Sequence, residues 1–222
     1  MDADSKVEEE TPVATSEQTT KKEEVTVEEF YDEESAASYA KMMDDEMAEY
    51  HGDLATVVSL LPATGLVLDV SCGSGHMLSY LATKVSASRP LHGIDLSPAM
   101  IPIASKQAPT AAIKQGTMVE LKGVDDKSAA AVLNTFALHH VSASDAEKTL
   151  AEAGRVLQPN GVLYLAVWEG TGSIDMPKKV VANQWPRDTV VAWLSNAGLT
   201  VLSERQKEWQ YGMNMLFVIA KR

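Results

Sequence analysis

From Pro62 onward the sequence alternates between short apolar runs and helical stretches, and this alternation limits the possible folds more than any other feature. Five apolar runs have the length and composition of buried strands: residues 66–70, 91–96, 111–116, 128–136 and 161–168. Stretches with helical character lie at residues 76–85, 97–107, 144–157 and 186–199. Nearly continuous apolar strands that alternate with helices predict a parallel sheet covered on both faces.

Local signals set several boundaries of these elements. Ser97 and Pro98 are typical of a helix N-cap and first turn, Ser144 and Glu147 have capping-box spacing, and Gly198 is a helix stop. Two closing strands are expected at 200–209 and 214–222, and their short separation indicates that at least one is antiparallel. The predicted fold is α/β: a doubly wound, mostly parallel seven-stranded sheet with helices on both faces (Rossmann-like) and one antiparallel strand near the C-terminus.

The negative charge of the chain is concentrated at its beginning. Residues 1–50 hold 17 Asp and Glu against 4 Lys, a net charge of -13, whereas residues 51–222 hold 14 acidic against 15 basic residues, a net charge of +1. We expect an acidic disordered tail over residues 1–28, an N-terminal helical lid over 29–50 and one catalytic domain over 51–222. The balanced domain lacks a basic stripe, so nucleic acid is not expected as a partner.

Neither a secretory leader nor a membrane-spanning run is recognisable, so we expect no membrane partner. The single cysteine, Cys72, cannot form an intramolecular disulfide, and no Cys and His residues have zinc-ligand spacing. These observations favour a cytoplasmic protein without a metal site, and the oligomeric state stays open.

The stretch VLDVSCGSGH, residues 67–76, joins the first strand to the next helix and has small residues at Ser71, Gly73 and Gly75. Ligands of open α/β sheets bind at the carboxyl ends of the strands, and free N–H groups begin the following helix. The small side chains therefore predict close contact between this backbone and a ligand.

The spacing of the loop argues against a dinucleotide as that ligand. The dinucleotide pattern G-x-G-x-x-G requires a third glycine at position 78, which is Leu78. Asp69 ends the first strand and Asp95 ends the second, and a carboxylate at such a position can accept hydrogen bonds from both hydroxyls of a ribose.

These motifs resemble those of the class I S-adenosylmethionine-dependent methyltransferases, specifically the small single-domain type. The resemblance begins with VLDVSCGSG (67–75) and GIDLSPAMI (93–101), and it continues through NTFALHHV (134–141) and AGRVLQPNGVLYLAVWEG (153–170). It covers about residues 30–222 and implies S-adenosylmethionine as the cofactor.

The resemblance also implies roles for individual residues. Those expected around the methionine part of the cofactor are Asp69, Ser71, Gly73 and Gly75. Asp95 would bind the ribose, and the expected neighbours of the adenine ring and the remaining pocket wall are Leu96, Met100, Thr117, Met118, Asn134 and Phe136. The chain departs from the family pattern at Ser71 (usually Gly), Thr117 and Ala129 (commonly Asp) and Asn160 (usually Gly).

Methyl transfer from a sulfonium is an in-line displacement, so the enzyme must chiefly hold the nucleophile and the methyl group in line. A base is required only when the nucleophile carries a proton, and the candidates are His139 and His140 after the fourth strand; the alternative is that both only shape the pocket. Aromatic candidates for substrate binding are Tyr31, Tyr39, Trp168 and Trp185, with ordinary core packing as the alternative.

The predicted function is methyl transfer from S-adenosylmethionine to an oxygen, nitrogen or carbon atom of a small-molecule acceptor. The segment between Trp168 and Pro186 is short for a substrate-capping insertion, so we expect the helix from Phe30 to Tyr50 to be the lid. The alternative is a catalytically idle methyltransferase-like subunit that binds the cofactor or a partner, and a nicotinamide oxidoreductase is a third hypothesis.

Overall fold

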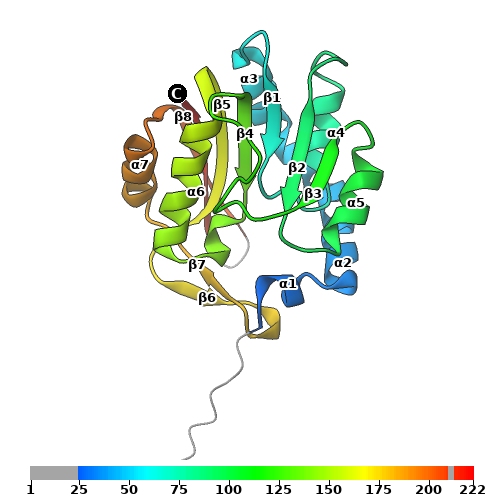
Figure 1. Ribbon diagram of the computed structural model, residues 1–222. Helices are drawn as coiled ribbons and strands as arrows, with labels where there is room; N and C mark the ends of the chain where they lie inside the picture. The colour runs from blue at the N-terminus through cyan, green and yellow to red at the C-terminus, as the bar shows by residue number, and fades with distance from the viewer. Residues whose placement is uncertain (1–24, 210–212) are drawn as a thin grey trace, which may run out of the picture.

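A seven-stranded sheet forms the centre of the computed structural model, which describes residues 25–209 and 213–222 apart from the side chain of Lys179. The strands are β1 (Leu66–Asp69), β2 (Leu91–Asp95), β3 (Ala112–Gln115), β4 (Ala129–Thr135), β5 (Leu157–Glu169), β8 (Thr200–Glu208) and β9 (Asn214–Lys221). Their order is β3-β2-β1-β4-β5-β9-β8, and β9 alone runs antiparallel to its neighbours β5 and β8. The predicted doubly wound sheet with one antiparallel strand is confirmed (Figure 1).

Helices cover both faces of the sheet. One face packs against α3 (His51–Leu60), α4 (His76–Ala82) and α5 (Met100–Gln107), and the other packs against α6 (Ala143–Val156) and α7 (Arg187–Asn196). Residues that alternate along each strand divide between the two faces; Leu133 belongs to the α3–α4 side and Val132 to the α6–α7 side. This two-sided burial explains why the central strands are apolar throughout.

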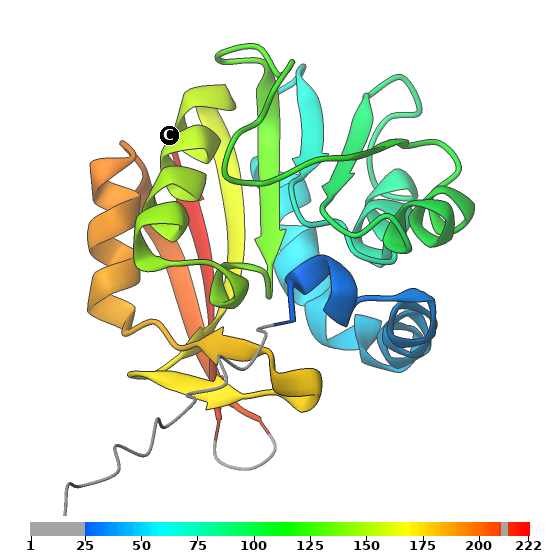
Figure 2. The ribbon, with the colours of Figure 1, turned by 60° about the horizontal axis from the view of Figure 1, so that its bottom comes forward.

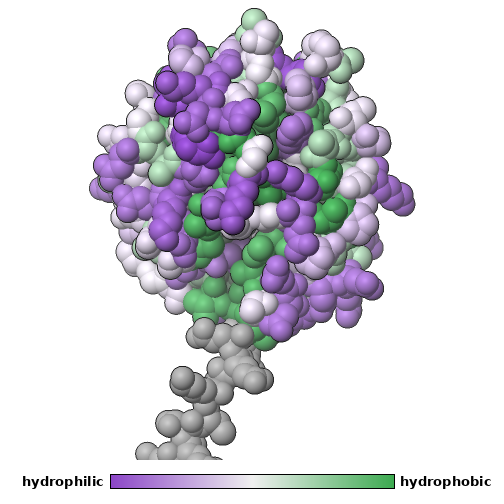
Figure 3. Space-filling view, in the orientation of Figure 1, coloured by the Kyte–Doolittle hydropathy of each residue, from purple (hydrophilic) through white to green (hydrophobic). Residues whose placement is uncertain are grey.

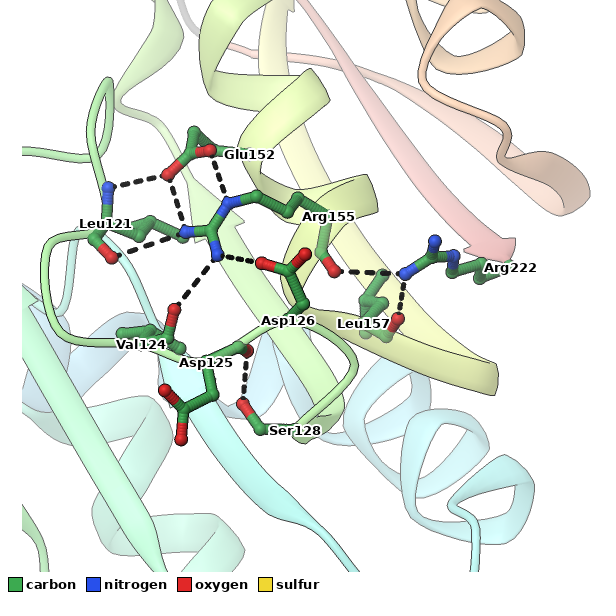
Figure 4. A network of polar contacts seen from close by, with 9 residues as sticks. All are labelled: Leu121, Val124, Asp125, Asp126, Ser128, Glu152, Arg155, Leu157 and Arg222. Carbon is green, nitrogen blue, oxygen red and sulfur yellow. Dashed lines mark hydrogen bonds and ion pairs between the residues drawn. The ribbon is translucent and has the colours of Figure 1, made fainter.

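Arg155 of α6 holds the connection that leads into β4 (Figure 4). Its guanidinium donates hydrogen bonds to Glu152 at 2.7 and 2.9 Å, to Asp126 at 2.6 Å and to the carbonyl of Val124 at 3.0 Å. Arg222 donates to the carbonyls of Arg155 and Leu157, which joins the last residue of the chain to the same network. The network lies at the start of β4, away from the carboxyl ends of the strands.

The cap of α6 differs from the prediction. Ser142, rather than Ser144, is the N-cap, and its Oγ accepts a hydrogen bond from the backbone N–H of Asp145 at 3.1 Å. Ser142 has the extended backbone that a cap requires, so the helix begins two residues earlier than the Ser144–Glu147 spacing indicates.

The N-terminal segment is not the continuous helix predicted from Phe30 to Tyr50. It consists of α1 (Val27–Phe30), α2 (Glu33–Glu46) and the 3₁₀ turn η1 (Met47–Tyr50). The break occurs because Asp32 caps α2, accepting a hydrogen bond from the N–H of Ser35 at 2.9 Å. The acidic tail expected over residues 1–28 lies largely outside the described residues.

A two-stranded hairpin that the sequence did not predict follows β5. Its strands are β6 (Ser173–Asp175) and β7 (Val181–Asn183), with the short turn η3 (Pro177–Lys179) between them. The hairpin and the α1–α2 segment lie at the same end of the molecule, toward which the parallel strands point (Figures 1 and 2). Within the described ranges, no helix has both the length and the apolar character needed to cross a membrane.

Candidate functional site

Two cavities lie at the carboxyl ends of the parallel strands. The inner cavity, of about 150 Å³, is bounded by the residues that follow β1, β2, β3 and β4. The outer cavity, of about 500 Å³, lies between α2, the hairpin and the ends of β4 and β5. Tyr31, Tyr39 and Phe136 line both, so they form the wall between the two cavities. The position agrees with the rule that ligands bind where the strand order reverses, here between β1 and β4.

Gly73 and Gly75, in the loop after β1, have different structural roles. Gly73 lines the inner cavity with a φ of +48°, and a Cβ there would lie 3.1 Å from the Tyr39 ring. Gly75 has a φ of +84°, but a Cβ there would lie 2.9 Å from the backbone of Ala104 in α5. Gly75 is therefore required for the packing of α4 on α5 and does not line the cavity.

Asp95 links the ends of β1 and β2. Its two oxygens accept hydrogen bonds from the backbone N–H groups of Gly73 at 2.7 Å and Ser97 at 2.9 Å. Burial raises the pKa of Asp95 above its usual value, although these N–H groups oppose the shift. The carboxylate is thus fixed in orientation and lines the inner cavity.

Asp69 lies behind this loop and is 1% exposed. Its Oδ1 accepts a hydrogen bond of 3.4 Å from the N–H of Ser71, whereas Oδ2 has no partner among the described residues. Burial raises its pKa to about 7, with a smaller contribution from the nearby charge of Asp95. The Ser71 Oγ is likewise buried without a partner.

Most of the other residues predicted for the cofactor meet at the inner cavity. Besides Ser71, Gly73 and Asp95, the lining includes Leu96, Met100, Thr117, Met118 and Phe136. Asn134 lies behind the wall; its Nδ2 contacts the Met118 sulfur at 3.2 Å and its Oδ1 has no partner in the described part of the chain.

Phe136 has a strained backbone at the boundary between the cavities. Its φ is +51°, a left-handed value that is rare for a bulky residue, and its N–H donates to the carbonyl of Ala166 at 2.8 Å. Such strain persists only where the surroundings enforce it, and it directs this ring between the two cavities.

The two histidines divide between the cavities. His140 lines the inner cavity and its Nε2 lies 3.2 Å from the Tyr31 hydroxyl, whereas His139 lines the outer cavity. Burial lowers the pKa of His140 to about 4 and that of His139 well below 6.5, so both rings are neutral at pH 7. Burial also raises the pKa of Tyr31 to about 12, so its hydroxyl keeps its proton; which of the two groups donates the hydrogen bond depends on the tautomer of His140.

Three of the four aromatic residues predicted for the substrate lie at the cavities, and Trp185 does not. Tyr31, Tyr39 and Trp168 are lining residues. Trp185 packs in the α6–α7 core, with its Nε1 donating to the carbonyl of Leu138 at 3.0 Å and its ring against Trp193. Trp185 is thus buried in the core behind the 3₁₀ turn η2 (Leu138–His140), and we remove it from the candidate site.

Several lining residues of the outer cavity were not predicted as site residues from the sequence. They are Phe30, Met42, Met43, Met176, Lys178, Trp209 and Met215. Met43 of α2 belongs to the amphipathic pattern of this segment, which is a usable signal, whereas Met42 does not. Lys178 and Trp209 come from the hairpin and from the end of β8, and no local pattern indicates that these segments meet.

The structure offers little for metal or thiol chemistry. Over residues 25–209 and 213–222, no three His, Cys, Asp or Glu residues are grouped to hold a metal ion. Cys72 is buried, burial raises the pKa of its thiol, and its sulfur packs against Gly93. Cys72 therefore acts as a small packing residue.

Known proteins are similar to this chain in sequence and in fold. A family model described as a methyltransferase domain matches residues 67–161. The chain is 29% identical over 172 residues to the putative methyltransferase YqeM of Bacillus subtilis (strain 168), covering 74% of this chain and 68% of YqeM. It is 26% identical over 124 residues to the dTDP-3-amino-3,6-dideoxy-alpha-D-glucopyranose N,N-dimethyltransferase of Streptomyces fradiae, covering 54% of this chain but less than half, 48%, of that relative.

The fold comparison agrees with these matches. The crystal structure of a SAM-dependent methyltransferase from Methanosarcina mazei superposes with a TM-score of 0.64 at 20% identity, covering 75% of this chain and 96% of the other. The matched region contains β1, the glycine loop, β2 and β4, which are the elements that build the inner cavity. Residues 67–161 thus match a methyltransferase domain, and the chain has the Rossmann-like fold of the class I S-adenosylmethionine-dependent methyltransferases.

Proposed function

We propose that this protein transfers the methyl group of S-adenosylmethionine to an oxygen, nitrogen or carbon atom of a small-molecule acceptor. The observation that carries the proposal is the pair of adjoining cavities, which share the wall of Tyr31, Tyr39 and Phe136. The inner cavity is assigned to the cofactor and the outer cavity to the acceptor. Bound cofactor supplies an electrophilic methyl group on a sulfonium, and the chain must align the nucleophile with it.

The residues of the inner cavity fit this cofactor. Two buried acceptor atoms, Asp69 Oδ2 and Asn134 Oδ1, lack partners among the described residues, and burying a polar atom without a partner is costly. Both residues lie behind the cavity lining, so we propose that a donor-rich cationic ligand reaches these atoms when the lid opens, and its charge would offset the Asp95 carboxylate at the lining. Asp95 would bind the ribose hydroxyls, and Leu96, Met100 and Met118 supply apolar surface for the adenine ring.

The inner cavity is too small for the whole cofactor as it stands. Its volume of about 150 Å³ lies below the roughly 300–1,000 Å³ of typical ligand sites, because Tyr39 packs over Gly73. We assign the lid role to the α1–α2 segment, residues 25–46, which must move outward for the cofactor to enter.

Few polar contacts hold this lid. The Asp44 carboxylate lies 2.9 Å from Nε2 of His76, and Ser97 Oγ donates to the Tyr31 carbonyl at 2.8 Å. Lys178 of the hairpin contacts Asp32 at 2.6 Å and Ser35 at 2.8 Å. The hairpin thus shares the lid function, although the short spacing between Trp168 and Pro186 favoured the N-terminal helix alone.

His139 is better placed than His140 to contact an acceptor. The Nε2 of His140 is engaged by Tyr31, whereas the Nε2 of His139 has no hydrogen bond to the described part of the chain and the ring lines the outer cavity. Because its pKa is lowered, the His139 ring is a weak base, and its neutral form can accept a hydrogen bond. We propose that His139 orients the hydroxyl or N–H group of the methyl acceptor by accepting a hydrogen bond from it.

A small molecule is the proposed acceptor because residues 51–222 carry nearly balanced charge without a basic excess, and the outer cavity, of about 500 Å³, has the size of a small-molecule site. The related Streptomyces fradiae enzyme acts on a small molecule by its name. We also propose a cytoplasmic location, on the single cysteine.

A screen of small-molecule acceptors that records S-adenosylhomocysteine release tests the proposal. Acceptor-dependent release supports it, and His139→Ala should then lower the rate.

The competing function is an idle cofactor-binding or partner subunit. The Ser71 Oγ, which is buried without a partner among the described residues at the usual glycine position, favours it. Cofactor binding without release for any acceptor, in a screen that includes a known enzyme as positive control, would support that alternative.

A further inference from the structure

The outer cavity has the lining of a site for apolar rings. Side chains from α2, β5, β9 and the segment after β8 surround it, and the apolar ones include Met42, Met43, Trp168, Trp209 and Met215. Met42 is 43% exposed, although it is a large hydrophobic residue. Figure 3, in the orientation of Figure 1, shows hydrophobic side chains gathered at the lower end of the visible face of the molecule, where α1, β6 and β7 lie.

The charges at the same cavity are predominantly negative. Glu34 and Glu46 line it, and neither forms an ion pair with a described side chain. Lys178 is the cation among the described lining residues, and its ammonium is already paired with Asp32 at 2.6 Å. Lys207, near the Trp209 ring, is paired with Glu49 at 2.7 Å.

The neutral state of His139 removes a further source of positive charge, because burial keeps its pKa well below 6.5. A phosphate or carboxylate that entered the cavity would therefore lose water without gaining a free cation from the described lining. Its charge would also lie beside two carboxylates, and like charges in a partly desolvated site repel.

We infer that the outer cavity takes an uncharged, ring-bearing apolar acceptor and excludes sugar nucleotides, diphosphates and other anionic molecules. That the bound molecule is a methyl acceptor rests on the proposed function. The preference for uncharged over anionic molecules depends only on the side chains that line the cavity. Aromatic and thioether side chains hold flat rings by dispersion and offset stacking.

The test compares 2-naphthol with 2-naphthyl phosphate on the full chain in the presence of S-adenosylhomocysteine. Binding is followed by NMR of methionine methyl groups, and Met42→Leu and Met215→Leu variants assign the two resonances. 2-Naphthol is expected to shift both resonances, with an affinity at least about tenfold above that of the phosphate. Equal or tighter binding of the phosphate at these methyl groups would overturn the inference, as would 2-naphthol binding that leaves them unshifted.

Charge variants isolate the electrostatic part. Glu46→Lys should improve the affinity for 2-naphthyl phosphate by about threefold to tenfold without a matching gain for 2-naphthol. Asp45→Lys is the matched control, because Asp45 is exposed, lies one residue earlier and does not line the cavity. An equal gain in both variants would mean that general surface charge, and not the cavity, sets the preference.

The two proposals fail separately. If 2-naphthol binds as expected while calorimetry shows no S-adenosylhomocysteine binding, the methyltransferase function fails and the apolar site remains. If S-adenosylhomocysteine binds but the phosphate is preferred, the acceptor class is wrong and the cofactor site remains.

Discussion

Asp95 connects the two loops that form the floor of the inner cavity. Because it accepts an N–H from each loop, its carboxylate is already oriented before a ligand arrives. The same oxygens keep further lone pairs for ligand hydroxyls. At the residue scale, the cofactor site therefore depends on one charged acceptor whose position is set by backbone.

Replacing Asp95 with Asn should weaken S-adenosylhomocysteine binding by about tenfold to a hundredfold, because hydrogen bonds to a charged acceptor contribute more than those to an amide. Isothermal titration calorimetry measures the change. Asp125→Asn, in the connection before β4, is the control that should retain wild-type affinity. Unchanged affinity in the Asp95 variant would remove Asp95 from the site.

His140 should make the folded protein sensitive to acid. Its pKa is about 4 when folded against 6.5 as the ordinary value, so its stabilising contribution is complete above pH 6.5 and is lost as the pH falls toward 4. The difference in free energy of unfolding between wild type and His140→Gln should therefore fall by about 3 kcal/mol from pH 7 to pH 4.

Urea unfolding at several pH values measures this difference, in which the opposite titration of Asp69 cancels because both proteins contain it. Tyr31→Phe is the control, since it removes the hydrogen bond to His140 but keeps the titrating ring. Parallel pH profiles for wild type and His140→Gln would contradict the assignment.

The α1–α2 segment is the element that controls access to the inner cavity. It has a buried face, with Ala36 and Met43 packed inside, but its polar attachments are few. A variant that lacks residues 1–46 should bind S-adenosylhomocysteine at least about tenfold more weakly than wild type, because it loses Tyr31 and Tyr39. A variant that lacks residues 1–24 should bind as wild type does, and equal affinity of the two truncations would exclude a lid role.

Lys178 should affect the kinetics of the lid more than the stability of the fold. Its ion pair with Asp32 is partly exposed, so Lys178→Met should leave the urea midpoint of unfolding close to that of wild type. Release of S-adenosylhomocysteine, followed by stopped-flow fluorescence, should become about twofold to fivefold faster. Lys106→Met, on α5, is the control, and an unchanged release rate in the Lys178 variant would show that the hairpin does not hold the lid.

At this scale the sequence predicted the regular elements well and their irregular partners poorly. Apolar runs located β1, β2, β4 and β5, because burial on both faces leaves a strong pattern, and Gly198 marked the end of α7. The edge strand β3 was also located, although it is mostly exposed. The hairpin lacks such a pattern, since its strands are three residues long and only Ala182 among their residues is buried. Asp32 is the N-cap of α2, so the predicted lid helix is interrupted at this residue. The spacing of apolar residues does not indicate where such a cap lies.

At the scale of the whole molecule, the parallel sheet decides which residues meet. The inner cavity was largely predictable because four strands deliver their last residues to one edge. The outer cavity was predicted only in part: Trp168 was a candidate, but Met42, Lys178 and Trp209 come from segments far apart in sequence and from no shared motif. Gly75 shows the opposite error: a glycine of the ligand motif is there for helix packing.

The central claim is that the inner cavity is built for S-adenosylmethionine. Calorimetric titration of the full chain with S-adenosylhomocysteine, with NADH titrated in parallel, tests it most directly. We predict saturable binding of S-adenosylhomocysteine at one site per chain and no binding of NADH. No measurable binding of S-adenosylhomocysteine, or binding of NADH in its place, would contradict the account.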